Sequence, residues 1–295
     1  MTTSNLQIFT VATHENHHLD RLKRSAEKHN INLQVYGLGK SFPALGMKRL
    51  LMHEFLTQCD PNDMFMFVDA YDVIFLAGED EILAKYKEHY DNQIVFSAEQ
   101  NLGMYTIDDI YYFLKYPISN KRYKYLNTGS IIGPVKKGIE IFESVGLDKP
   151  NEPCDQVPVL RYFTHNPSAL TLDCDHHLFG VNGGRAGLEE RDYKFEKDRL
   201  YSVQTKTWPI LFHVPGKFFI ALDKVAKKLG FMDVLPEYSK QEKKLYSAAK
   251  KDHELCDKLG IENYTLRLIK NWTTNIGILL ILFLLIQQLF NWISR

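Results

Sequence analysis

Two aspartates follow an apolar run and are the first candidates for chemistry. Residues 64–68 are apolar in succession, and Asp69 and Asp72 come next, with Tyr71 between them. An uninterrupted apolar run predicts a strand buried on both faces, so Asp69 falls at its carboxyl end, where open α/β sheets bind ligands. Two carboxylates this close suit Mg²⁺ or Mn²⁺ better than zinc. Tyr71 would offer a flat face beside the ion, a combination that suits a nucleoside diphosphate.

Two alternatives for this acid pair remain open. The acids could be part of a solvated turn at the strand end, because short motifs also arise by chance. They could instead belong to a phosphatase with an aspartyl nucleophile. Such a site would need its second acid two residues after the first, whereas Asp72 follows Asp69 by three.

Three more candidates lie where predicted elements begin or end. Lys48 falls in the first turn of a helix predicted over 47–59, where a lysine works against the helix dipole and can reach outward to an anion. Asp155 precedes a helix predicted over 157–163, where it would either cap the helix or face a substrate. His213 ends an apolar strand. A lone histidine there is usually structural, and it becomes a candidate ligand only if a site needs a nitrogen donor.

Three other segments have structural alternatives. Metal donors run consecutively over 173–177, but in a predicted edge turn they are poorly arranged around one ion. The loop 37–46 contains three glycines and could contact a ligand or merely connect two elements. Tyrosines crowd the segment 101–125, where they could line a pocket for a ring-shaped ligand or simply pack.

The elements that must position these residues alternate between strands and helices. Apolar periodicity predicts strands over 6–12, 31–36 and 93–98 and helices over 19–29 and 80–90. The first strand, helix and strand form a βαβ unit, which implies a parallel sheet with a right-handed crossover.

Composition narrows the class of protein. The chain has 295 residues, 45% of them hydrophobic, as in globular proteins. Lys plus Arg and Asp plus Glu number 36 each, so no net field favours nucleic acid as a partner. The four cysteines form no CxxC pair, which argues against zinc and against a disulfide framework and favours a reducing compartment. The N-terminus lacks the basic region of a signal peptide.

The C-terminal sequence predicts a membrane anchor. Residues 276–286 are apolar without interruption, and 271–294 contains no ionised side chain. Trp272 and Trp292 lie about 30 Å apart along a helix, which matches the hydrocarbon thickness of a bilayer. A single span over 275–294 is therefore expected rather than a buried helix. With no N-terminal signal, the domain before it is expected in the cytosol.

Several segments run collinearly over roughly two thirds of the chain in a recognisable order: Thr10–Thr13, Arg24–Glu27, Gly37–Gly39, Gly46–Lys48, Phe67–Val73, Phe96–Glu99, Leu126–Gly129, Asp155–Gln156 and Pro209–His213. In this order they resemble the glycosyltransferase domain of the procollagen lysyl hydroxylase and procollagen galactosyltransferase group, most closely the lysyl hydroxylase form. No single segment is decisive, but the ordered set is specific.

The resemblance implies an α/β, Rossmann-like GT-A fold, a UDP-sugar donor and Mn²⁺, with Mg²⁺ as the alternative. It places the metal on Asp69, Asp72 and His213, and Asp155 at the sugar and acceptor end as the candidate catalytic residue. Phe42 stands where the family has a tryptophan in its uridine pocket. The predicted donor-binding residues, with Lys217 added for its charge, are Thr13, Phe42, Lys48, Tyr71, Asn127, Gly216 and Lys217.

The implied reaction is the transfer of a hexose, either glucose or galactose, from the UDP-sugar to a hydroxyl group. The acceptor would be hydroxylysine-like, or a hydroxyl on another protein or on a glycan. The chain departs from the family pattern on the acceptor side, at 101–104 and 151–154. Two alternatives therefore stay open: a catalytically silent, membrane-tethered UDP-sugar-binding protein, and a metal-dependent phosphatase. The expected division is a GT-A domain over 1–220, a helical juxtamembrane segment over 221–274 and a transmembrane helix over 275–294.

Overall fold

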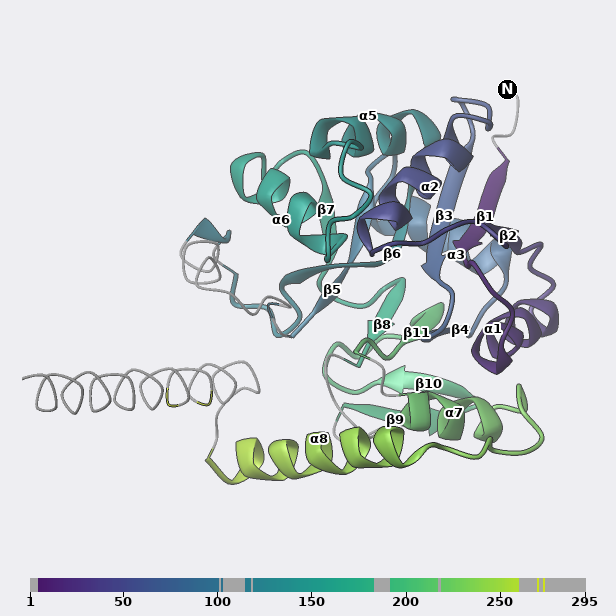
Figure 1. The fold of residues 1–295 in the computed structure, drawn as a ribbon, viewed down its shortest axis with the longest axis vertical. Helices are drawn as coiled ribbons and strands as arrows, with labels where there is room; N and C mark the ends of the chain where they lie inside the picture. The colour runs from purple at the N-terminus through teal and green to yellow at the C-terminus, as the bar shows by residue number, and fades with distance from the viewer. Residues whose placement is uncertain are drawn as a thin grey trace, which may run out of the picture.

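The structure is a computed structural model that describes residues 5–100, 102, 115–117, 119–182, 192–216, 219–259, 270 and 273. Its main sheet has six strands in the order β2-β1-β3-β6-β5-β7 (Figure 1). In chain order these strands are β1 (Leu6–Val11), β2 (Gln34–Tyr36), β3 (Met64–Asp69), β5 (Val95–Glu99), β6 (Tyr125–Pro134) and β7 (Thr171–Asp173). A second sheet has the order β4-β11-β8, with β4 (Val73–Phe75), β8 (Phe179–Val181) and β11 (Leu211–His213), and a hairpin joins β9 (Tyr193–Glu196) to β10 (Arg199–Ser202).

The described helices are α1 (His17–Lys28), α2 (Gly46–Leu56), α3 (Glu79–His89), α5 (Val135–Val145), α6 (Gln156–His165), α7 (Phe219–Lys228) and α8 (Lys240–Leu259). The predicted helices and strands up to β11 are found within a few residues of their expected bounds. Strands β4 and β8 and the β9-β10 hairpin were not predicted.

The main sheet is mixed, whereas the sequence predicted a parallel one. Strands β1, β2 and β3 pair in parallel, which confirms the βαβ unit. Strand β6, however, runs antiparallel to both β3 and β5. Nearly all of β6 is buried, although its sequence mixes apolar with small polar residues, and this pattern carries no information about strand direction.

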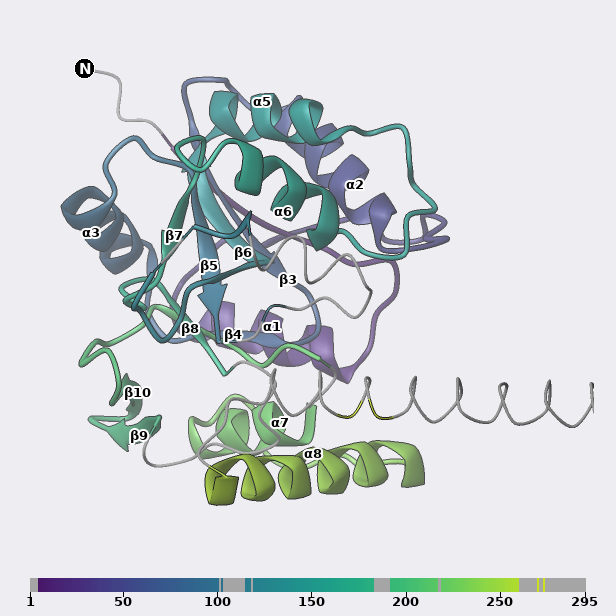
Figure 2. The ribbon, with the colours of Figure 1, turned by 90° about the vertical axis from the view of Figure 1, so that its left-hand side faces the viewer.

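Strand β3 is buried on both faces, as its apolar run predicted. Phe65 and Phe67 point into one core cluster, while Met66 and Val68 point into another. Helices α2, α5 and α6 cover the first face of the sheet (Figure 2). Helix α1 and the sheet β4-β11-β8 cover the second. Asp69 is therefore delivered to the edge where the two sheets meet.

A bulge in β6 shapes the same edge. Phe96 of β5 pairs with Ile131, but Ser97, the next residue, pairs with Asn127. Residues 128–130 of β6 therefore have no partner in β5. They bulge out of the β5–β6 pairing toward the end of β3.

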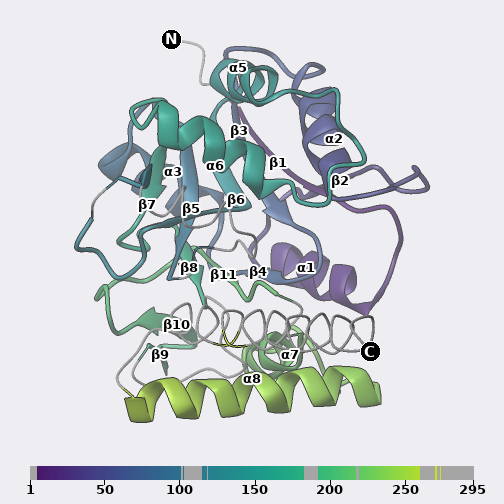
Figure 3. The same cartoon turned by 60° about the vertical axis from the view of Figure 1, so that its left-hand side comes forward.

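The C-terminal helices lie below the second sheet. Helix α7 packs against a third core cluster that includes Ile74 and Phe212, and α8 lies along α7 (Figure 3). In the part of the chain that is described, none of the helices has the length and apolarity needed to cross a membrane. The predicted span over 275–294 lies outside the described residues.

Candidate functional site

Three predicted metal ligands converge where the two sheets meet. Asp69 is the last residue of β3, and Asp72 immediately precedes β4. Strand β11 pairs antiparallel with β4, which sets His213 opposite Val73 and beside Asp72. The ligand atoms of Asp69, Asp72 and His213 all lie within 4.8 Å of one another. The sheet topology thus brings together residues far apart in the sequence.

The donor set fits a divalent cation. His213 is 1% exposed, and among the described residues neither ring nitrogen has a hydrogen-bond partner. Its Nε2 lies 3.4 Å from Asp72 Oδ2, an ion-pair contact longer than a normal hydrogen bond. Leaving a buried polar group unpaired costs stability, and a cation among these atoms would remove that cost. Two carboxylates with one imidazole suit Mn²⁺, which accepts both oxygen and nitrogen ligands.

Gly129, in the β6 bulge, leaves room for this cluster. A Cβ atom at this position would lie 2.3 Å from His213 Cε1 and 2.8 Å from Asp69 Oδ2. Any side chain here would displace two of the three ligands. The β6 backbone therefore approaches the ligand cluster closely at Gly129.

The buried charges of the cluster are coupled. Burial alone would lower the pKa of His213, but the Asp72 carboxylate more than offsets this and raises that pKa above 6.5. Burial would raise the pKa of Asp72, yet His213 outweighs it, so this pKa is lowered. Burial raises the pKa of Asp69, with Lys48 opposing. Asp72 thus favours the protonated imidazole, and a cation that binds His213 must replace this proton.

Lys48 joins this cluster to Asp155. Its Nζ lies 2.8 Å from Asp69 Oδ1 and 2.6 Å from Asp155 Oδ2. Burial alone would lower the pKa of Lys48, but Asp155 and Asp69 more than compensate and raise it. Lys48 thus reaches from the first turn of α2 to two anionic groups, and its ammonium is buried between the two carboxylates.

Asp155 faces the site and does not cap α6. It occupies the N-cap position, but its side chain makes no capping hydrogen bond to the described first turn. Its Oδ2 accepts a hydrogen bond from Thr128 Oγ1 at 2.7 Å, in addition to the Lys48 contact. Burial would raise the pKa of Asp155, but Lys48 and then Thr128 outweigh it, so the pKa is lowered. Asp155 is therefore a carboxylate at neutral pH.

The side chain of Asn127 stabilises the bulge through hydrogen bonds. Its Oδ1 accepts hydrogen bonds from Ser97 Oγ at 3.0 Å and from Gly129 N at 2.8 Å. Its Nδ2 donates to Glu99 Oε1 at 2.9 Å. The sequence pointed to Asn127 but missed its partners Ser97 and Glu99. It also missed Thr128, the partner of Asp155. Their signal was weak, since small polar residues at strand ends are common.

Thr13 and Tyr71 both contact His14, at the neighbouring sheet edge. Tyr71 donates a hydrogen bond from its hydroxyl to His14 O at 3.2 Å, and its ring lies 5.2 Å from the His14 ring. Thr13 Oγ1 contacts His14 Nδ1 at 3.3 Å. Both predicted donor-binding residues thus flank the acid pair on the side of β1.

The remaining predicted residues are less closely tied to the cluster. Phe42 is half-buried and packs against the core cluster around Phe55. Gly216 is exposed and has a φ of 91°, a backbone conformation that favours glycine. Lys217 lies outside the described residues. The roles of these three residues stay predictions.

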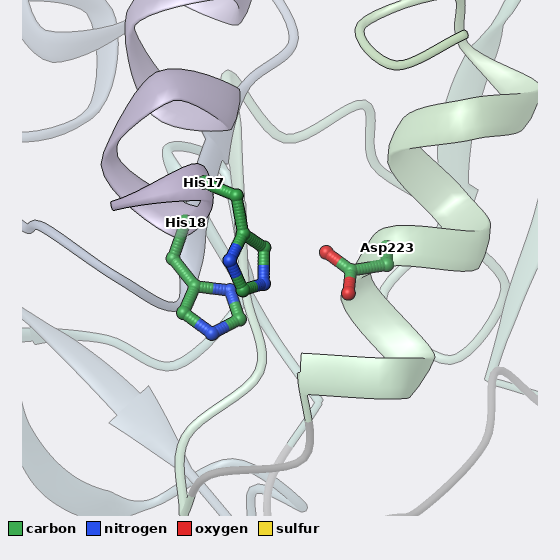
Figure 4. Close-up of side chains that lie close together, drawn as sticks. All are labelled: His17, His18 and Asp223. Atoms are coloured by element: carbon green, nitrogen blue, oxygen red, sulfur yellow. The ribbon is translucent and has the colours of Figure 1, made fainter. Parts of the chain in front are cut away.

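A second group of donors lies at the start of α1. His17, His18 and Asp223 have ligand atoms within 4.8 Å of one another, and both rings face α7 (Figure 4). However, Asp223 Oδ1 is paired with Arg21, and Oδ2 accepts from Tyr238 at 3.0 Å. Burial, followed by Arg21, lowers the pKa of His18 to about 3. A guanidinium already occupies this position, so the group is an ion pair joining α1 to α7.

The donors at 173–177 have structural roles in place of the metal cluster considered above. Asp173 accepts backbone hydrogen bonds from His177, Leu178 and Phe179. His176 is fully buried and contacts Ala98 O at 3.3 Å. Among the tyrosines of 101–125, the described ones, Tyr116, Tyr123 and Tyr125, are buried, so packing accounts for them.

A family model described as the PLOD GT domain matches residues 2–231. Curated relatives include procollagen-lysine,2-oxoglutarate 5-dioxygenase 1 from Bos taurus, 29% identical over 227 residues, and from Mus musculus, 31% identical over 230 residues. Each of these matches covers 72% of this chain and 30% of the relative. A Caenorhabditis elegans protein named multifunctional procollagen lysine hydroxylase and glycosyltransferase is 27% identical, covering 76% of this chain and 32% of that protein.

Among solved structures, a glycosyltransferase involved in glycosylation of the major capsid of PBCV-1 is similar, with a TM-score of 0.47 and 14% identity, covering 77% of this chain and all of that one. The family match extends over most of the chain and includes every described residue of the ligand cluster. The chain therefore belongs to the PLOD glycosyltransferase domain family and has its GT-A-like α/β fold.

Proposed function

We propose that this protein is a metal-dependent glycosyltransferase that moves a hexose, glucose or galactose, from a UDP-sugar to a hydroxyl group. The observation that carries the proposal is the convergence of Asp69, Asp72 and His213 around the space kept open by Gly129. The family match supports sugar transfer as the reaction class.

Asp69, Asp72 and His213 would hold Mn²⁺, with Mg²⁺ as the alternative. When bound, the ion supplies positive charge next to the donor diphosphate, where negative charge grows as the sugar leaves. The buried imidazole of His213 favours Mn²⁺, because Mg²⁺ prefers oxygen ligands.

Lys48 and Asp155 contribute charge on the other side of Asp69. The raised pKa of Lys48, which its two carboxylate neighbours cause against burial, keeps it an ammonium that can stabilise the leaving diphosphate. Asp155, an ionised carboxylate fixed by Lys48 and Thr128, can accept a hydrogen bond from the acceptor hydroxyl and so orient it. Thr13, Phe42, Tyr71, Asn127, Gly216 and Lys217 complete the proposed donor-binding set.

The proposed acceptor is a hydroxyl of hydroxylysine type on a protein, or a glycan. The names of the curated relatives refer to procollagen lysine, and one of them names a glycosyltransferase. Those proteins extend far beyond the region matched here, so the acceptor is inferred by analogy alone. We also propose a single membrane span over 275–294, with the domain on the cytosolic side, on the sequence pattern given above.

The test is UDP release by the purified chain. With UDP-glucose or UDP-galactose and Mn²⁺, we expect steady release of UDP that stops on chelation and in Asp72→Asn. Binding of UDP without any release over a broad acceptor panel would instead indicate the silent binding protein. Phosphate release from phosphomonoesters would indicate the phosphatase. Protease added to sealed membranes with the cytosolic face outward tests the topology, since a fully protected domain would contradict it.

A further inference from the structure

Helix α8 carries an apolar stripe on its exposed side. The helix runs along α7, on the side away from the six-stranded sheet (Figures 1 and 3). Tyr246 packs toward the third core cluster, and Cys256, which adjoins the stripe, is buried. Leu245, Leu255 and Leu259, by contrast, are 46%, 39% and 57% exposed. Isolated exposed leucines are ordinary, but three along one helix form a surface feature.

The leucines share one side of the helix because of their spacing. Positions alternating by three and four residues line up on a helix. On α8 this series is Leu245, Ala248, Asp252, Leu255 and Leu259. Three of the five positions are leucines and one is alanine, so the stripe is apolar except at its middle.

A row of lysines borders this stripe. Lys244, Lys251 and Lys258 recur every seven residues and are all exposed. Each immediately precedes a position of the stripe, so the three charges form a parallel row along its edge. An exposed apolar stripe with a cationic row beside it is typical of helices that lie in the interface of an anionic bilayer.

The single acid of the stripe is neutralised. Asp252 Oδ1 lies 2.5 Å from Lys270 Nζ. Lys270 also precedes, in the sequence, the apolar run at 276–286. The contact therefore removes a negative charge from the stripe.

We propose that this side of α8 binds the surface of an anionic membrane, and we call it the α8 face: Leu245, Leu255 and Leu259 with Lys244, Lys251 and Lys258. The leucines enter the boundary between headgroups and acyl chains, and the lysines approach the headgroup phosphates. A second copy of the chain is disfavoured as the occupant. In a two-fold contact through this face the lysine rows would lie close together and repel, whereas an anionic bilayer offers opposite charge. The proposal does not depend on sugar transfer.

Lysines near an anionic surface each contribute about fivefold to membrane affinity. Replacing two of them, as in K244Q/K251Q, should therefore weaken binding to anionic vesicles roughly 25-fold. Since surface charge is screened by salt, this part of the binding should also fall as ionic strength rises.

The experiment measures partitioning of the full chain into phosphatidylcholine vesicles with and without phosphatidylserine. Vesicles without phosphatidylserine report any binding by the apolar sequence after Lys270, so the difference between the two isolates the charge-dependent part. The matched control is K243Q/K250Q, which removes the same charge from positions one residue earlier, about 100° around the helix. Circular dichroism checks that both variants fold.

We expect the wild type and K243Q/K250Q to prefer the anionic vesicles and K244Q/K251Q to lose most of that preference. Equal binding of the wild type to both vesicles would overturn the proposal. So would equal losses in the two variants, because binding would then follow net charge and not the α8 face. A wild-type chain that is a dimer in solution and binds both kinds of vesicle equally weakly would show that a second copy covers this face instead.

Discussion

Lys48 Nζ lies 2.6 Å from Asp155 Oδ2, and the same ammonium lies 2.8 Å from Asp69. One cation thus links the predicted metal ligands to the carboxylate proposed to orient the acceptor. Lys48 and Asp155 are buried and Asp69 is partly buried, which makes the three charges interdependent.

Lys48→Met should destabilise the protein strongly. The change leaves two carboxylates facing each other without their shared cation, and breaking a buried ion pair in this way costs about 3–5 kcal/mol. The double variant K48M/D155N removes the opposing charge as well and should recover part of the loss. Urea denaturation of the two single variants and the double variant measures the coupling. Simple additivity of the three free energies would contradict the proposed interdependence.

Gly129→Ala should weaken metal binding. The added Cβ would lie 2.3 Å from His213 Cε1, so the imidazole or the bulge must shift. We expect Mn²⁺ affinity, measured by calorimetry, to fall at least about 10-fold. The control is Gly39→Asn, because a Cβ at Gly39 meets nothing within 4 Å in the described part of the chain and asparagine tolerates its φ of 76°. Unchanged Mn²⁺ affinity in Gly129→Ala would show that the metal site does not need a glycine at this position.

Mn²⁺ affinity should rise with pH. Asp72, against the effect of burial, raises the pKa of His213 above 6.5, and the ring must lose its proton before it can bind a metal. Below that pKa the apparent affinity should increase about tenfold per pH unit and then level off. His213→Gln, which has no titrating group, should bind more weakly and show a flatter profile. A profile as steep as that of the wild type would exclude His213 as a ligand.

His176 should make the fold sensitive to acid. Burial lowers the pKa of His176 from 6.5 to about 4, while both ring nitrogens are engaged, by Ala98 O and by Tyr193 OH. As the pH falls below 6.5, His176 becomes protonated in the unfolded chain but stays neutral in the folded chain. Stability is therefore lost between pH 6.5 and about 4.

By pH 5 this histidine should have cost about 2 kcal/mol. Urea denaturation at pH 7 and pH 5 gives the loss, and His176→Gln should show a smaller loss over the same interval even though it starts less stable. Identical losses in the wild type and the variant would assign the acid sensitivity to other groups.

Much of the site could be predicted because its residues sit at the ends of apolar runs. A strand buried on both faces must be apolar throughout, so the first acid after it, Asp69, marks the sheet edge. His213 follows the same logic at the end of β11. The two acids and the histidine could therefore be expected together once a common edge was assumed.

The rest depends on contacts between distant segments, which local patterns do not encode. The position of Lys48 between Asp69 and Asp155 depends on two segments that are distant from it in the sequence. The reversed direction of β6 leaves no trace in its buried sequence. The buried ion pair of Arg21, by contrast, could have been predicted. Arg21 falls on the same buried side of α1 as His18 and Leu22, and a buried arginine needs a buried partner.

Calorimetry of UDP binding with and without Mn²⁺ tests the central claim most directly. The wild type should bind UDP in the presence of Mn²⁺ and lose most of that affinity on chelation. Asp69→Asn/Asp72→Asn should bind UDP as weakly with Mn²⁺ as the wild type does without it, because the ligands that hold the ion against the diphosphate are gone. Tight UDP binding by the double variant that still depends on Mn²⁺ would show that the metal lies elsewhere and would contradict the assignment of this site.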